Sequence, residues 1–161
     1  MIRRVIPSTD AATITRIYNR YICETTVSFE TEPLSVEQMQ KRIEDIASKY
    51  PYFVYEKDGV VIGYAYVHNW KERAAYQKTV EATIYLDFNC KREGVGTKLA
   101  TKIIQASREM GFHAIIACIT EENRESLEFH KKMGFKKVSH FLKVGEKFGR
   151  QLDVVDMELQ L

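Results

Sequence analysis

The sequence predicts one α+β domain with a mixed β-sheet and helices on both of its faces. Two helical periodicities near the N-terminus, a run of β-rich segments, and alternating helix and strand signals afterwards lead to this prediction. A chain of 161 residues is the size of one ordinary domain. No linker, repeat or low-complexity segment divides it, so residues 1–161 are expected to fold as a unit.

The N-terminal part is expected to hold one short strand and two helices. Residues 3–6 form the strand, and Pro7 then begins a helix whose apolar side chains recur at helical spacing. A second helix begins after Ser35, because the Ser35 hydroxyl and the Gln38 side chain match a capping box. Pro51 ends this helix.

Three strands are expected next. Asp58-Gly59 is a strong hairpin signal between two β-rich segments. Residues 79–88 then alternate, so that one face of this strand carries Val80, Ala82, Ile84 and Leu86, and the other carries Thr79, Glu81, Thr83 and Tyr85.

The C-terminal part is expected to alternate helices and strands. An apolar stripe predicts a helix that Gly111 closes, with the members Val95, Leu99, Ile103, Ala106 and Met110. The continuous apolar run at 113–119 predicts a strand covered on both faces. A short helix ending at Gly134 and two strands around a glycine-bearing turn complete the chain.

Composition excludes several classes of function. The net charge of +2 is the small difference between 24 basic and 22 acidic residues, which argues against bulk electrostatic binding to nucleic acid or to a membrane surface. No apolar run approaches the length of a membrane span, and the N-terminus lacks the apolar core of a signal peptide. Three cysteines without a close pair indicate a reducing compartment, so we expect a cytoplasmic protein.

The stretch "NCKREGVGTKLA", residues 89–100, places two glycines in front of a helix. Unpaired N–H groups at a helix start favour an anion such as phosphate. A dinucleotide fingerprint would need a third glycine where Leu99 stands, and a P-loop would need lysine where Thr97 stands. A simple turn at Gly94 and Gly96 is the alternative.

The loop resembles a known family. "KREGVG" after "EATIYLDFNC" is similar to the Gln/Arg-x-x-Gly-x-Gly/Ala pyrophosphate loop of the GNAT superfamily of acetyl-CoA-dependent N-acetyltransferases, with Lys91 where Gln or Arg is usual. The blocks "TTVSFETEP", "WKERAAYQKTVEATIYL", "IACITEENRESLEFHKKMGF" and "VGEKFGRQLDVVDMEL" resemble the phosphinothricin and methionine sulfoximine acetyltransferases. The resemblance implies a three-layer fold around a mostly antiparallel sheet of about seven strands, and a homodimer.

The resemblance also implies a site for acetyl-CoA. The main chain of Tyr85, Leu86 and Asp87 would pair with the pantetheine arm, to which Asn123 would also hydrogen-bond, although Asn123 is equally suited to cap a helix. The pyrophosphate would be held at Lys91, Arg92, Glu93, Gly94, Val95, Gly96 and Thr97.

Two residues are catalytic candidates under this resemblance. Attack by an amine requires its neutral form, and Glu81 would act as the general base, directly or through water. Its alternative role is an ordinary solvent-facing carboxylate. His130 stands where many members of the family place a tyrosine that protonates the departing thiolate, and it would act as an acid or orient the substrate. A structural histidine is its alternative.

The acceptor is expected to be a small amino-acid-like molecule with an anionic group. Lys71, Arg73 and Tyr76 would face it from a loop, with Phe29 as an apolar wall and Thr83 as a further lining residue. Solvated charges and core packing are the competing roles. Histidines without ligand-spaced partners predict no metal, and Cys90 and Cys118 are expected to be small buried hydrophobes.

The sequence therefore predicts transfer of an acetyl group from acetyl-CoA to an α-amino group by direct attack, with acceptors of the phosphinothricin, methionine sulfoximine or methionine sulfone type. Two alternatives stay open at this stage. One is a related enzyme acting on another amine, such as a protein N-terminus or a polyamine. The other is a module that binds acetyl-CoA without catalysis.

Overall fold

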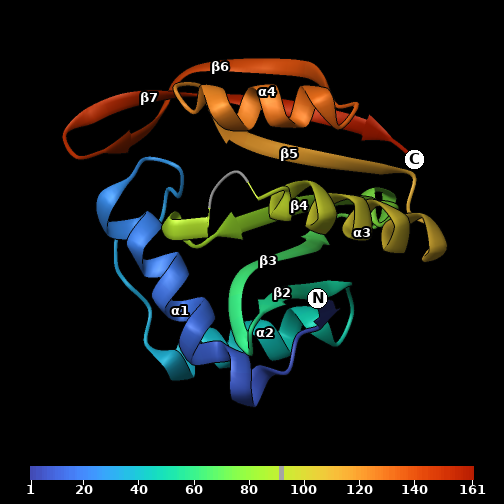
Figure 1. Cartoon of the computed structure of the whole chain (residues 1–161). Helices are drawn as coiled ribbons and strands as arrows, with labels where there is room; N and C mark the ends of the chain where they lie inside the picture. Colours follow the sequence, from blue (N-terminus) through green and yellow to red (C-terminus); the bar gives the residue numbers. More distant parts are fainter. Residues whose placement is uncertain (91–92) are drawn as a thin grey trace.

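The computed structural model describes residues 1–90 and 93–161. In this part of the chain seven strands form one sheet in the order β1-β2-β3-β4-β5-β7-β6 (Figure 1). β4 and β5 are parallel and every other neighbouring pair is antiparallel. The strands are β1 Ile2–Arg4, β2 Tyr52–Lys57, β3 Val60–Asn69, β4 Thr79–Leu86, β5 Ala114–Thr120, β6 Lys136–Lys147 and β7 Arg150–Gln160.

In the described part of the chain, four α-helices cover the two faces of the sheet, which confirms the three-layer prediction (Figure 1). α1 (Pro7–Glu24) and α2 (Val36–Ala47) pack on one face around Ile14, Ile43 and Tyr64. α3 (Val95–Glu109) and α4 (Arg124–Lys132) contribute to the core on the other face. Two short 3₁₀ turns, Ala74–Tyr76 and Phe88–Cys90, flank β4.

Local sequence signals predicted most ends of the helices and strands correctly. The Ser35–Gln38 capping box is present in both directions, and Asp58 and Gly59 both have positive φ in the hairpin turn. The first strand, however, ends at Arg4 and not at residue 6, because Ile6 is already the N-cap of α1. Met110 is the C-cap of α3 and is exposed, so the apolar stripe ends one turn earlier than expected.

The expected burial of two cysteines was wrong. Cys90 lies in a 3₁₀ turn and is partly exposed, while Cys118 is exposed although it lies within β5. Ile116 and Thr120, which flank Cys118 on the same face of β5, are buried. The exposure of Cys118 therefore marks a local opening in a strand that is otherwise covered on both faces.

That opening arises where two central strands separate. β4 and β5 pair only through Thr79, Val80 and Glu81, and the last matched positions are Glu81 and Ile116. Beyond this point β4 stays with β3 as far as Leu86, whereas β5 stays with β7 as far as Thr120. The sheet is thus continuous at one end of β4 and split at the other.

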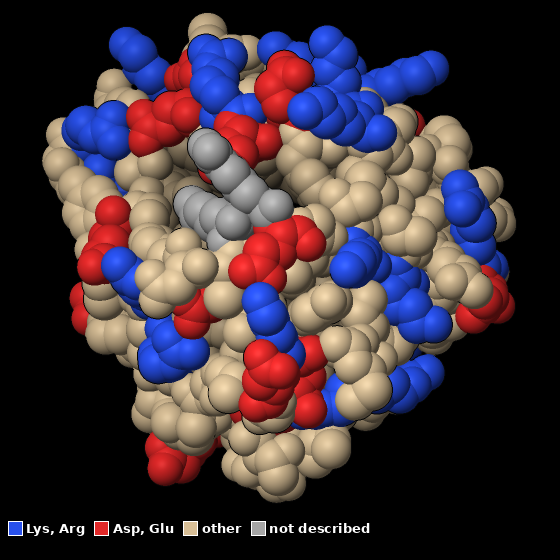
Figure 2. All heavy atoms as spheres, in the orientation of Figure 1, with Lys and Arg blue, Asp and Glu red and all other residues tan. Residues whose placement is uncertain are grey.

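The surface carries charges of both signs. Figure 2 shows basic and acidic side chains interspersed over the visible face, in keeping with the net charge of +2. None of the helices in the described part of the chain is sufficiently long and apolar to span a bilayer.

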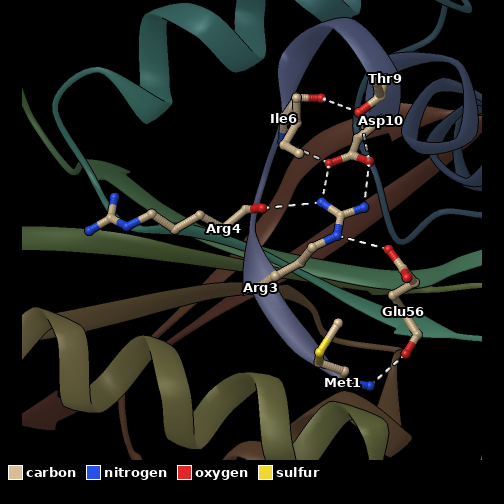
Figure 3. Close-up of polar contacts among 7 residues, drawn as sticks. All are labelled: Met1, Arg3, Arg4, Ile6, Thr9, Asp10 and Glu56. Atoms are coloured by element: carbon tan, nitrogen blue, oxygen red, sulfur yellow. Dashed lines mark hydrogen bonds and ion pairs between the residues drawn. The ribbon is translucent and has the colours of Figure 1, made fainter. Parts of the chain in front are cut away.

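The N-terminus of α1 is fixed by an ion pair to β1 (Figure 3). Arg3 donates to both carboxylate oxygens of the buried Asp10, at 2.8 and 2.9 Å, and to Glu56 of β2 at 2.8 Å. The N–H of Ile6 also donates to Asp10, at 2.7 Å, so the Asp10 carboxylate ties the N-cap residue to the first turns of α1, although Ile6 has no capping side chain of its own. Burial alone would raise the pKa of Asp10, but these hydrogen bonds outweigh it and the pKa lies below its ordinary value.

We expect Asp10→Asn to lower the free energy of unfolding by about 2 kcal/mol at pH 7, the scale of hydrogen bonds to a buried charged group. Because folding lowers the pKa of Asp10, the ionised carboxylate contributes fully to the free energy of unfolding above its ordinary pKa of 3.8. This contribution is lost as the pH falls through the lower pKa of the folded protein. Urea unfolding at pH 7 and pH 2.5 measures both effects. Asp45→Asn, at an exposed site on α2, is the matched control, and an equal loss in both variants would contradict the assignment.

Candidate active site

A cleft of about 500 Å³ opens where β4 and β5 separate. Side chains from both sides of the split sheet reach it: Glu81 and Thr83 from β4, Cys118 from β5, and His130 from α4. The segment after α1 closes it with Val27, Ser28, Phe29 and Glu30. The structure therefore brings six of the predicted site residues together around the cleft, namely Phe29, Glu81, Thr83, Tyr85, Asn123 and His130.

Glu81 is the last residue of β4 that has a partner in β5. It lies on the α1 side of the sheet, opposite His68 of β3 and beside Ile116 of β5. Burial, together with the negative charge of Asp156 on β7, raises the pKa of Glu81 to about 7. A carboxylate with this pKa can accept a proton from a group in the cleft at neutral pH.

His130 approaches the cleft from α4 and is buried. Its ring meets Phe129 and Phe135 edge-on, and its Nδ1 lies 2.8 Å from the carbonyl oxygen of Ser126. Because a carbonyl oxygen only accepts, Nδ1 carries the hydrogen and Nε2 of the neutral ring is an acceptor. Burial lowers the pKa of His130 below its ordinary value, which favours this neutral form.

A second cavity of about 200 Å³ continues the cleft along β4 toward Gly96. The N–H of Asp87 donates to the carbonyl of Ile62 at 2.8 Å, so Asp87 faces β3. Strand alternation then turns the main chain of Ile84 and Leu86 to the side that β5 has left. Of the three residues expected to pair with a ligand, Leu86 has this orientation, while the main chain of Tyr85 and the N–H of Asp87 face β3. The carbonyl of Asp87 accepts from the N–H of Cys90 in the following 3₁₀ turn.

The glycine loop leads from this cavity into α3. Gly94 is the N-cap with φ 72°, a left-handed conformation that glycine adopts without strain. Among the described residues, no atom beyond its immediate chain neighbours lies within 4 Å of the position of a Cβ there. The Glu93 carboxylate pairs with Lys57 at 2.7 Å. Val95 is buried, Gly96 lines the second cavity, and Thr97 is exposed. Lys91 and Arg92 lie outside the described residues.

Asn123 serves as the N-cap of α4, as its alternative role predicted. Its side-chain oxygen accepts a hydrogen bond from the N–H of Ser126 at 3.2 Å. It also lines both the cleft and the second cavity. The capping contact holds the residue at the junction between the two cavities, so both roles are compatible.

The loop after β3 does not reach the cleft. Lys71, Arg73 and Tyr76 are absent from the residues that line it. The ammonium of Lys71 lies 4.2 Å from the ring centre of Trp70 and 5.3 Å from that of Tyr76, a cation–π arrangement on the surface. Among the described residues, no lysine or arginine lines the cleft.

Several lining residues had not been identified from the sequence. His68 and Tyr66 could have been found, because the Asp-Gly hairpin and strand alternation place them on the same face as Glu81 once β3 is paired with β4. Ser28 and Glu30 carried no comparable signal. They lie in an irregular segment, and only contacts with distant parts of the chain bring them to the cleft.

The chain resembles known acetyltransferases over nearly its whole length. Residues 4–155 match the family model for an acetyltransferase (GNAT) domain. A phosphinothricin N-acetyltransferase of Streptomyces viridochromogenes is 34% identical, covering 94% of this chain and 82% of the relative. An L-methionine sulfoximine/L-methionine sulfone acetyltransferase of Salmonella typhimurium is 33% identical, covering 98% and 93%.

A solved structure agrees with the fold. The GNAT superfamily phosphinothricin acetyltransferase from Sinorhizobium meliloti, in complex with acetyl-CoA, is 31% identical and superimposes with a TM-score of 0.95, covering 100% of this chain and 88% of that one. The split between β4 and β5, the family match over most of the residues and relatives above 30% identity agree: this chain belongs to the GNAT acetyltransferase family.

Proposed function

We propose that this chain transfers the acetyl group of acetyl-CoA to the α-amino group of a small amino-acid-like acceptor, with Glu81 as the general base. The observation that carries the proposal is the Glu81 carboxyl, whose pKa is raised to about 7 at the point where the sheet splits. The relatives named above act on phosphinothricin, methionine sulfoximine and methionine sulfone, which supports this class of acceptor.

The residues present fit acetyl-CoA. Main-chain groups of Ile84 and Leu86 face a gap with no strand on the other side, and a cavity runs beside them to Gly96. The amides of the pantetheine arm can pair with such groups as a strand would. The first N–H groups of α3, after Gly94, would hold the pyrophosphate at the positive end of the helix. When bound, the co-substrate supplies the activated thioester.

Glu81 and His130 have different roles toward the acceptor amine. The amine nitrogen attacks the thioester carbon, the new C–N bond forms, and the C–S bond breaks, so that CoA leaves as its thiolate and takes up a proton from water. Glu81 takes the proton that the amine loses, directly or through water. Since Nε2 of neutral His130 is an acceptor, His130 is suited to orient the amine and not to protonate the departing thiolate.

A polyamine is a second candidate acceptor. The described lining of the cleft contains Glu30 and Glu81 but no lysine or arginine, a composition that favours a cationic molecule. Arg42 neutralises Glu30 through two hydrogen bonds of 2.8 and 2.9 Å, which weakens this preference and keeps the amino-acid acceptor as the first candidate. Thiol release measured with free amino acids, methionine sulfone and spermidine separates the two classes.

We expect Glu81→Gln to lower kcat by about 10²-fold or more, the usual scale of general-base catalysis. The KM for acetyl-CoA stays unchanged. In the wild type kcat/KM should fall below about pH 7, because Glu81 must be ionised to accept a proton, and this limb should vanish in Glu81→Gln. Glu128→Gln, at an exposed position of α4, is the matched control. An unaltered pH profile in Glu81→Gln would exclude the base assignment.

We expect Gly94→Glu to abolish acetyl-CoA binding, because a carboxylate at the start of α3 repels the pyrophosphate and a side chain strains a residue with φ 72°. Isothermal titration with acetyl-CoA measures the loss. Gly59→Glu is the control: Gly59 has φ 77° and equally open surroundings but lies in the β2–β3 hairpin. Normal affinity in a folded Gly94→Glu variant would rule out the loop as the phosphate site.

We further propose that the chain is a cytoplasmic homodimer that uses the exposed apolar side chains of β6. Leu142 and Val144 are 72% and 60% exposed, and Val138, Phe141 and the neighbouring Phe148 are also exposed. Soluble monomers rarely leave a large contiguous apolar patch in water, so a second copy of the chain is a suitable cover. Three cysteines without a disulfide support a reducing compartment.

Leu142→Asp should therefore convert the protein to a monomer at micromolar concentration, since a buried unpaired carboxylate opposes association. Light scattering measures the mass. Val60→Asp introduces the same charge at an exposed apolar residue of β3 and should leave the assembly intact. A monomeric wild type would refute the dimer proposal.

A further inference from the structure

The 25–30 segment, which follows α1, forms one wall of the cleft without any regular secondary structure. Val27, Ser28, Phe29 and Glu30 all line the cleft from this segment. A segment that lacks a helix or strand ladder must be held by other contacts if it is to keep one position. The contacts that hold it come from several distant elements.

Strand β6 supplies a buried lysine to this segment. Lys147, its last residue, is only 4% exposed, and its ammonium donates to the carbonyl oxygen of Ser28 at 2.6 Å. The two residues are 119 positions apart in the chain. Burial lowers the pKa of Lys147, against the opposing effect of Glu30. The ammonium also lies 5.2 Å from the ring centre of Phe148. Because a buried ammonium is costly to leave without an acceptor, the Ser28 carbonyl is an important partner for it.

Two residues earlier on β6, a glycine makes room for Phe29. A Cβ at Gly145 would lie 2.2 Å from Cε2 and 2.6 Å from Cζ of Phe29, so the ring packs directly on the Gly145 main chain. Phe29 is 41% exposed and lines the cleft. Thus β6 supports the backbone immediately before Phe29 through Lys147 and supports the ring itself through Gly145.

Other contacts hold the two ends of the 25–30 segment, whereas β6 contacts its middle, at Ser28 and Phe29. Thr120 of β5 donates to the carbonyl of Thr26 at 2.6 Å. Glu30 is bound by Arg42 of α2 and by Tyr18 of α1, whose hydroxyl also lies 2.9 Å from the Ser28 hydroxyl. The Ser28 carbonyl, one peptide before Phe29, is held by Lys147.

We propose that Lys147 is a positioning residue for the acceptor: by holding the Ser28 carbonyl it keeps the Phe29 ring against Gly145, and the ring sets how tightly the acceptor binds. The proposal rests on the acyl-transfer function of the cleft. Lys147 itself lines neither the cleft nor the second cavity; it contacts the Ser28 carbonyl behind the cleft wall, so it acts through Phe29 and not on the reacting atoms.

The first experiment compares steady-state kinetics of Lys147→Met with wild type. Methionine keeps about the length of the lysine side chain but cannot donate a hydrogen bond. We expect the KM for the acceptor to rise about tenfold, the effect of losing one hydrogen bond from a charged group. The values of kcat and of KM for acetyl-CoA stay near wild type, because Glu81 and the cofactor cavity are unaltered. Lys136→Met, at an exposed site of the same strand, is the matched control.

A double-variant cycle tests the route through Phe29. If Lys147 acts by positioning the ring, then Phe29→Ala combined with Lys147→Met raises the acceptor KM no further than Phe29→Ala alone. Independent, multiplicative effects would overturn the proposal. Should Lys147→Met fail to fold, Gly145→Ala provides the second variant, because its methyl group displaces the Phe29 ring and should raise the acceptor KM while Lys147 is kept.

Hydrogen exchange separates failure of this proposal from failure of the proposed function. In Lys147→Met the amides of the 25–30 segment should exchange faster, while those of β4 stay as protected as in wild type. Unchanged exchange in the 25–30 segment would overturn the positioning role whatever the activity. A different outcome is faster exchange in Lys147→Met together with a wild type that releases no thiol with any acceptor. That result would overturn the acyl-transfer function, and with it the role of the Phe29 ring in acceptor binding.

Discussion

The separation of β4 from β5 after Glu81 and Ile116 is the constraint on which the rest of the site depends. A strand in the middle of a sheet normally has both of its edges paired, and here β4 loses one partner for its last residues. The main-chain groups of Ile84 and Leu86 are left facing a gap, where a side chain, water or a ligand must satisfy them. Tyr21 already donates to the Leu86 carbonyl at 2.7 Å, a contact that holds α1 at the edge of the gap.

The same separation sets the electrostatics of Glu81. In a fully paired sheet its carboxyl would be enclosed, and on an open surface it would be solvated, but at the point of divergence it is half-buried and near Asp156. Its pKa is raised above the unfolded value of 4.5, so ionising it in the folded protein opposes folding increasingly as the pH rises from that value to about 7. The position that suits Glu81 to the proposed role of base therefore lowers stability at neutral pH.

The sequence predicted those features that local contacts determine. The capping box at Ser35, the Asp-Gly hairpin and the face of β4 that carries Glu81 depend on residues a few positions apart, and the structure confirmed all three. The 25–30 wall depends on Lys147 and Thr120, more than ninety positions away, and no local pattern reveals such contacts. Lys71 was expected in the cleft because its charge suits an anionic acceptor, but charge alone does not say that Trp70 and Tyr76 hold its ammonium on the surface.

The proposed base and the proposed acceptor wall are built on different kinds of structure, and this has a physical consequence. Glu81 lies on a strand whose position is set by main-chain hydrogen bonds to β3, so substitutions elsewhere move it little. Phe29 lies on an irregular segment whose position depends on a few side chains, above all the Lys147 ammonium and the space at Gly145. A change at one of those contacts can reshape the acceptor side without disturbing the proton acceptor. Acceptor preference in this chain should therefore vary more readily than its chemistry, because the two depend on contacts that do not overlap.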